Sequence, residues 1–203
     1  VPDGIAHYLE HKMFENESGI DSLMTLMSLG LDANAYTTND HTAYLFSGTD
    51  NFYEGLDELM DYVQHPYYTD ENVEKERPII SQEIGKYDDM PSWRLYINAV
   101  QNMYHNNTVR IDTAGTVETI SHITKETLYS CYNTFYNPAN SIMCISGDFN
   151  PKEIVSEIKK RLLKKEKITS IKRIYPEEPE TINRKIKEEK IKNIASLKKK
   201  KWM

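Results

Sequence analysis

Cysteine is scarce in this sequence, and long apolar runs are missing from it. Only Cys131 and Cys144 occur among 203 residues, and they form no Cys-x-x-Cys pair. This scarcity excludes a disulfide-stapled secreted scaffold, which needs a denser cysteine framework. No apolar run approaches the roughly 18 residues that a transmembrane helix requires, so the sequence predicts no membrane span.

Basic residues are also few over most of the chain. Residues 1–150 contain 7 Lys and Arg against 23 Asp and Glu, a net charge of −16, whereas residues 151–203 contain 18 against 8, a net charge of +10. An acidic body of this kind excludes a nucleic-acid-binding core. The basic end could meet a nucleic acid or an anionic membrane surface, but a run of like charges is more often a solvated tail.

The sequence does contain enough apolar side chains for a core, because 39% of its residues are hydrophobic. We expect one partial domain over residues 1–170. Pro and Glu cluster after that point and a lysine-rich end follows, so we expect a linker and a poorly ordered basic tail over 171–203. Val1 leads directly into a dense motif, and we therefore expect further residues before it.

Helical and strand-like periodicities alternate along the chain. Residues 33–48 read as two strands joined by a turn at Asn39-Asp40, and residues 141–146 read as a short buried strand. Asp3 is a candidate cap for the first helix. Helices are expected over 5–14, 19–29, 51–64, 69 into the 80s, 91–104, 124–136, and from 150 onward. The hairpin favours an α+β fold, with helices packed on a largely antiparallel sheet, over a doubly wound parallel fold.

The first predicted helix carries the pattern His-x-x-Glu-His, formed by His7, Glu10 and His11. Histidines at i and i+4 lie one turn apart on one face, so both imidazoles can reach one zinc ion. Glu10 lies on nearly the same face and can act as general base toward a zinc-activated water. A catalytic zinc usually takes three protein ligands, so one is still missing. The alternative is a pair of polar histidines on an exposed helix face.

Four segments in order resemble the insulinase/pitrilysin family of zinc peptidases, the inverzincins, and most of all its bacterial processing-peptidase-like branch. They read DGIAHYLEHKMF, LDANAYTTNDHTAYLF, EKERPIISQEI and YNPANSIMCISGDF, and they span about residues 2–149. The His-x-x-Glu-His motif is the signature of the inverzincins. The resemblance implies a Zn²⁺ cofactor, a cytoplasmic bacterial protein, and a fold that is one incomplete half of a two-half peptidase chamber.

The resemblance also implies the third ligand. A glutamate some 70–80 residues after the motif completes the site in the family, and Glu83 fills that position. Glu76, seven residues earlier, falls on nearly the same helical face and would orient a ligand from behind. Residue spacing alone does not separate Glu83 from Glu76 or Glu71, and Glu76 can also be read as a solvated helix charge.

Asn34 and Ala35 form the second functional element that the resemblance implies. In the family, an exposed edge strand at this place binds the substrate peptide as an added strand, and Asn34 would hold the scissile carbonyl or its oxyanion. The alternative is an ordinary hairpin strand, in which threonine and tyrosine are simply good strand formers.

The sequence therefore predicts a zinc-dependent metalloendopeptidase that hydrolyses extended peptides. Family members have two related halves or subunits, and an Arg and a Tyr of the second half reach the substrate. We expect a second homologous half or subunit as the partner of this chain, and the sequence leaves open whether the chain is active alone. The alternative is a peptide-binding, non-catalytic or incomplete subunit of a two-part peptidase, and a defective fragment is the third reading.

Overall fold

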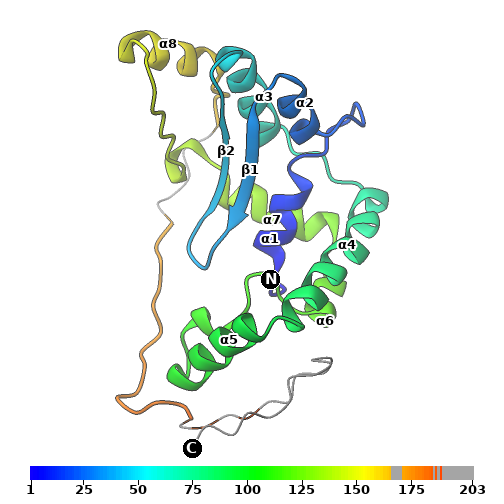
Figure 1. Cartoon of the computed structure of the whole chain (residues 1–203), viewed down its shortest axis with the longest axis vertical. Helices are drawn as coiled ribbons and strands as arrows, with labels where there is room; N and C mark the ends of the chain where they lie inside the picture. Colours follow the sequence, from blue (N-terminus) through cyan, green and yellow to red (C-terminus); the bar gives the residue numbers. More distant parts are fainter. Residues whose placement is uncertain (166–170, 185, 187, 189–203) are drawn as a thin grey trace, which may run out of the picture.

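The computed structural model describes residues 1–165, 171–184, 186 and 188. A β-hairpin stands in front of two helices, with the remaining helices around it (Figure 1). The α-helices are α1 Ile5–Lys12, α2 Ser22–Ser28, α3 Phe52–Gln64, α4 Asp70–Asp88, α5 Pro91–Met103, α6 Val117–Ser121, α7 Lys125–Phe135 and α8 Pro151–Arg161. Among these residues, no helix is both long enough and apolar enough to cross a membrane.

The hairpin consists of β1 (Asp32–Thr37) and β2 (Thr42–Ser47), which pair antiparallel. Asn39-Asp40 lies in the connecting turn, as predicted. Ala33, on the inner face, is buried, and helix α1 packs against both strands. This arrangement of helices on an antiparallel sheet confirms the predicted α+β class.

Helix α1 lies at the centre of the molecule, between the hairpin, α4 and α7 (Figure 1). Its residues Ile5, Tyr8 and Leu9 are buried in the main core. The Tyr8 hydroxyl donates to the backbone carbonyl of Val73 on α4, which ties the two helices together. The helix that carries the His-x-x-Glu-His motif is therefore fixed on three sides.

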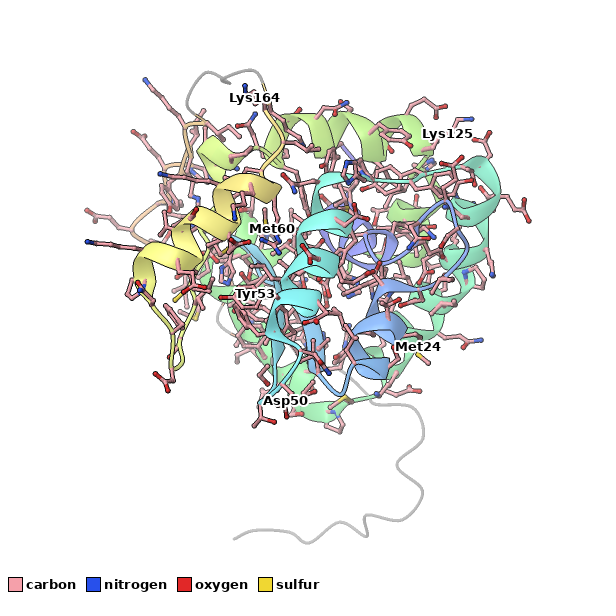
Figure 2. All side chains as sticks on the ribbon, turned by 90° about the horizontal axis from the view of Figure 1, so that it is seen from above. Met24, Asp50, Tyr53, Met60, Lys125 and Lys164 are labelled. Atoms are coloured by element: carbon pink, nitrogen blue, oxygen red, sulfur yellow. The ribbon has the colours of Figure 1, made fainter. Side chains whose placement is uncertain are left out.

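Local sequence signals account for most helix boundaries. The hydroxyls of Thr69 and Thr124 each accept a backbone N–H in a capping box at the start of α4 and α7. Asn150 caps α8, and Pro151 occupies its first position. Helix α8 lies beside α3 when the molecule is seen from above (Figure 2).

Two local predictions are wrong. The residue that precedes α1 in the cap position is Gly4, at φ +91°, and no side chain caps this helix, so Asp3 is not the cap. Residues 141–146 are not a strand, and the side chain of Ile142 is 97% exposed. The reason is that no other strand pairs with this segment among the described residues, so it has no sheet to join.

The segment after α8 contacts two distant parts of the fold. Arg173 donates from Nη2 to the backbone carbonyl of Asp40 in the hairpin turn at 2.7 Å. The Glu178 carboxylate accepts the backbone N–H groups of His105 and Asn106 at 2.7 and 2.6 Å. The boundary at residue 170 stays a prediction, and the lysine-rich end expected to be poorly ordered lies outside the described residues.

We expect Gly4→Ala to destabilise the protein strongly, because a methyl group at Gly4 would meet the carbonyl oxygen of Ala114 and the backbone would keep a left-handed φ. The left-handed conformation costs about 1–2 kcal/mol and overpacking adds about 1–3 kcal/mol. Gly19→Ala is the matched control, because Gly19 has φ +75° and open space around it. Urea unfolding midpoints would measure both variants, and equal losses would contradict the close approach at Gly4.

Candidate metal centre

The two histidines of α1 face α4, on the side of the helix away from its most buried residues. The ring centroids of His7 and His11 lie 4.6 Å apart in an edge-to-face arrangement. Their side chains are 13% and 24% exposed, so the site is shielded but open to solvent on one side. This placement follows from the i, i+4 spacing that the sequence shows.

Glu83 approaches both histidines from α4. Its Oε2 lies 3.7 Å from Nε2 of His7 and 3.4 Å from Nε2 of His11. Two ligands bound at 2.0–2.1 Å to one tetrahedral zinc ion are separated by about 3.4 Å, so these distances fit a zinc site. Among the described residues, His7, His11 and Glu83 are the only such group, with donor atoms within 4.8 Å of one another.

Glu76 lies behind His11, two helical turns before Glu83. Its Oε1 is 2.9 Å from Nδ1 of His11, and its side chain is 10% exposed. Because an ionised carboxylate only accepts hydrogen bonds, Nδ1 donates and Nε2 keeps its lone pair. Glu71, the third carboxylate that the spacing allowed, is exposed and lies outside the cluster. Of the two inner carboxylates, the geometry places Glu83 in front of the histidines and Glu76 behind them.

Burial and the neighbouring groups together shift the pKa values of His7, His11 and Glu76. Burial lowers the pKa of His7, and the nearby His11 acts in the same direction. Burial is the largest single influence on His11 and lowers its pKa, but the hydrogen bond to Glu76 and the nearby carboxylate charges together raise the pKa of His11. Burial likewise acts to raise the pKa of Glu76, but the hydrogen bond to His11 and the nearby positive charges together lower it. Glu76 is therefore ionised and able to hold His11.

Glu10 lies on α1 between the two histidines in sequence but is not part of the donor cluster. Its side chain is buried, and its Oε2 accepts a hydrogen bond from the hydroxyl of Thr37 on β1. Burial raises the pKa of Glu10, while the Thr37 hydrogen bond opposes that rise. A buried carboxylate with a raised pKa beside a cluster of metal-ligand type has the properties of a general base.

Asn34 and Ala35 lie on β1, as predicted, and pair with Leu45 and Tyr44 of β2. Asn34 is exposed, and its side-chain oxygen accepts the backbone N–H of Ala35 at 2.9 Å. No further strand pairs with β1 among the described residues, so one edge of it is free to accept another chain.

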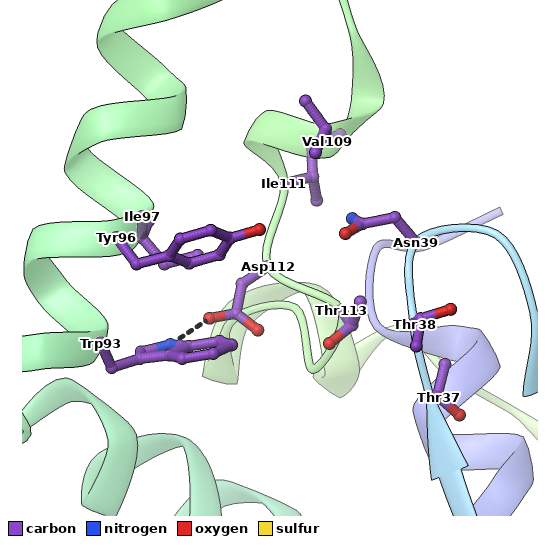
Figure 3. A pocket seen from close by; sticks show the side chains of 10 residues that line it. All are labelled: Thr37, Thr38, Asn39, Trp93, Tyr96, Ile97, Val109, Ile111, Asp112 and Thr113. Atoms are coloured by element: carbon purple, nitrogen blue, oxygen red, sulfur yellow. Dashed lines mark hydrogen bonds between the residues drawn. The ribbon is translucent and has the colours of Figure 1, made fainter.

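A cavity of about 220 Å³ lies between the hairpin turn, α5 and the segment 109–113 (Figure 3). Trp93 donates from Nε1 to Oδ2 of Asp112 at 2.9 Å across its floor. The lining residues are Thr37, Thr38, Asn39, Trp93, Tyr96, Ile97, Val109, Ile111, Asp112 and Thr113. The sequence did not predict this cavity. The one available signal was the pair Trp93 and Tyr96, which share a helix face at i, i+3 spacing.

Comparisons with known proteins agree with this geometry. A model of the insulinase family (peptidase family M16) matches residues 2–117, and a model of the peptidase M16 inactive domain matches residues 122–201. The chain is 49% identical over 189 residues to the uncharacterized zinc protease YmfH of Bacillus subtilis. The aligned region covers 93% of this chain and 42% of that relative.

Two solved structures share the fold. An M16-like peptidase from Alicyclobacillus acidocaldarius matches with a TM-score of 0.83 at 48% identity, over 91% of this chain and 44% of that one. The first half of the periplasmic protease PqqL from Escherichia coli matches with a TM-score of 0.76 at 25% identity, over 86% of this chain and 40% of that one. The chain spans less than half the length of these relatives. It belongs to the insulinase family, peptidase family M16.

Proposed function

We propose that this chain supplies the zinc site and the general base of a metalloendopeptidase. The observation that carries the proposal is the convergence of His7 Nε2, His11 Nε2 and Glu83 Oε2 at separations that suit one tetrahedral ion. The donor set, two imidazoles and a carboxylate, is of a catalytic type that leaves a fourth position open. Relatives named zinc proteases support the same metal.

The residues have distinct roles in the proposed reaction. Zinc, when bound, would lower the pKa of water and polarise the peptide carbonyl. Glu10 would take a proton from the attacking water and pass it to the leaving amine. Glu76 would keep His11 in the orientation that presents Nε2. Peptide hydrolysis needs each of these steps at a fixed geometry.

The hairpin suits an extended substrate. A peptide could add to the free edge of β1 at Asn34 and Ala35, where backbone hydrogen bonds would hold it with little sequence preference. The cavity lined by Trp93 and Tyr96 also includes Thr37, the residue that contacts the base. We assign this cavity to an apolar or aromatic side chain next to the cleaved bond.

Hydrolysis of a quenched fluorescent peptide would test the proposal. We expect the zinc-loaded chain to cleave an unstructured peptide that has an aromatic residue beside the cut site, and removal of zinc by a chelator to stop cleavage. Re-addition of zinc is the control and restores the rate. Cleavage that continues after zinc has been removed completely would contradict a metalloendopeptidase.

A second candidate function is a zinc-binding subunit that needs a homologous half for catalysis. It is favoured by the length of the relatives, of which this chain matches 42–44%, and by its match to 40% of the first half of PqqL. Adding a separately prepared second half of a close relative would distinguish the two functions. Activity that appears only in the mixture supports the subunit, and equal activity of the chain alone supports the complete catalyst.

A further inference from the structure

The carboxylate of Glu10 is the end of a chain of hydroxyl groups. The Thr37 hydroxyl donates to Oε2 of Glu10, and Oγ1 of Thr37 lies 3.2 Å from Oγ1 of Thr42 on the opposite strand. Two hydroxyls, one from each strand of the hairpin, therefore lead to one carboxylate oxygen.

The chemistry of these groups gives the chain one direction. An ionised carboxylate accepts only, so the single hydroxyl proton of Thr37 must point to Glu10. Thr37 Oγ1 then accepts from Thr42. The Thr42 hydroxyl thus orients the Thr37 hydroxyl, and aligned hydroxyls of this kind strengthen one another.

The strand that carries Thr42 is anchored in the core. Tyr44, two residues further along β2, packs edge-on against Phe14 at 5.9 Å between ring centroids. Its hydroxyl lies 2.8 Å from the hydroxyl of Tyr136, on which Tyr132 stacks at 5.0 Å. Packed aromatic side chains therefore fix the position of β2 behind Thr37.

We propose that Thr37 is a positioning residue that fixes the carboxylate of Glu10 during peptide hydrolysis. With Oε2 held by Thr37, Oε1 is the oxygen that takes the proton from water. Thr37 lies two residues after Ala35 on the same face of β1, so one strand both receives the peptide and orients the base. The inference rests on the proposed peptidase function, and it adds a role for the hairpin beyond substrate binding.

Kinetics of hydroxyl-deletion variants test the role in catalysis. Thr37→Val keeps the shape of the side chain and removes the hydroxyl, and Thr37→Ser restores the hydroxyl. We expect Thr37→Val to lower kcat by about 10- to 100-fold while KM changes by less than about twofold, and Thr37→Ser to recover most of the rate. Thr42→Val, which acts through Thr37, should lower kcat by less.

Zinc content and a matched control separate positioning from general damage. All variants should bind as much zinc per chain as the parent, because Thr37 bonds to Glu10 and is not one of the three converging donors. Thr134→Val is the control, because its hydroxyl donates to a backbone carbonyl on the exposed face of α7. A Thr37→Val variant that keeps the parent kcat, or that loses rate only through zinc loss, would overturn the proposal.

A second readout does not need activity. In protein labelled with ¹³C at threonine Cβ and dissolved in mixed H₂O and D₂O, a slowly exchanging hydroxyl gives two resolved Cβ signals. We expect two signals for Thr37 in the parent, one averaged signal for Thr134, and one for Thr37 in Glu10→Ala. A parent that hydrolyses no peptide overturns the proposed function, whereas a fast-exchanging Thr37 hydroxyl overturns the positioning contact.

Discussion

Glu10→Gln is expected to remove at least about 99% of the peptidase activity while the chain still binds its zinc ion. The substitution keeps the size of the side chain and its contact with Thr37 but takes away the group that accepts the proton. General-base catalysis contributes about 10²- to 10⁴-fold to a rate, and kcat/KM should fall by that factor. Zinc binding should persist because Glu10 is not one of the three converging donors.

Paired assays of rate and metal content would check this expectation. Glu71→Gln is the matched control, since Glu71 is an exposed carboxylate on α4 outside the cluster. Its rate and zinc content should equal those of the parent. A Glu10→Gln variant with full activity would show that another group acts as base, and one without zinc would show that Glu10 is a ligand.

Glu83→Gln should release zinc, and this is the largest expected effect on metal binding. Oε2 of Glu83 faces both histidine Nε2 atoms, and a neutral amide is a much weaker zinc ligand than a carboxylate. Glu76→Gln should weaken zinc binding by only about 10- to 100-fold, because Glu76 orients His11 without facing the site. The two neighbouring carboxylates on α4 therefore serve as controls for each other.

Zinc per chain after dialysis and the melting temperature would measure both variants. Zinc at 100 times its Kd adds about 2.7 kcal/mol of stability, which raises Tm of a chain of this size by roughly 5–11 °C. We expect this rise in the parent, a smaller one in Glu76→Gln, and none in Glu83→Gln. Equal zinc loss in the two variants would contradict the assignment of Glu83 as a zinc ligand and of Glu76 as the residue that orients His11.

The sequence predicted those features of the fold that depend on neighbouring residues. His7 and His11 share a helix face because they are one turn apart, and Asn39-Asp40 forms the hairpin turn because short polar residues favour turns. The start of α7 follows from Thr124 at its cap. Each of these signals acts over a few residues, so the sequence alone is sufficient to find it.

Features that depend on contacts between distant parts of the chain could not be predicted in the same way. The sequence could not rank Glu83 against Glu76 from spacing, because the choice depends on how α4 packs against α1. The strand predicted over 141–146 failed because a strand needs a partner, and periodicity says nothing about where one lies. The cavity at Trp93 arises between α5 and the hairpin turn, which are far apart in sequence. The cytoplasmic location stays a prediction.

The exposed segment 141–146 also makes the protein easy to label. It carries Cys144, which is exposed, whereas the other cysteine, Cys131, is buried and has a pKa raised by that burial. A maleimide dye should therefore attach to one thiol without any engineering of the sequence. Fluorescence from that position would report directly when another polypeptide covers the segment.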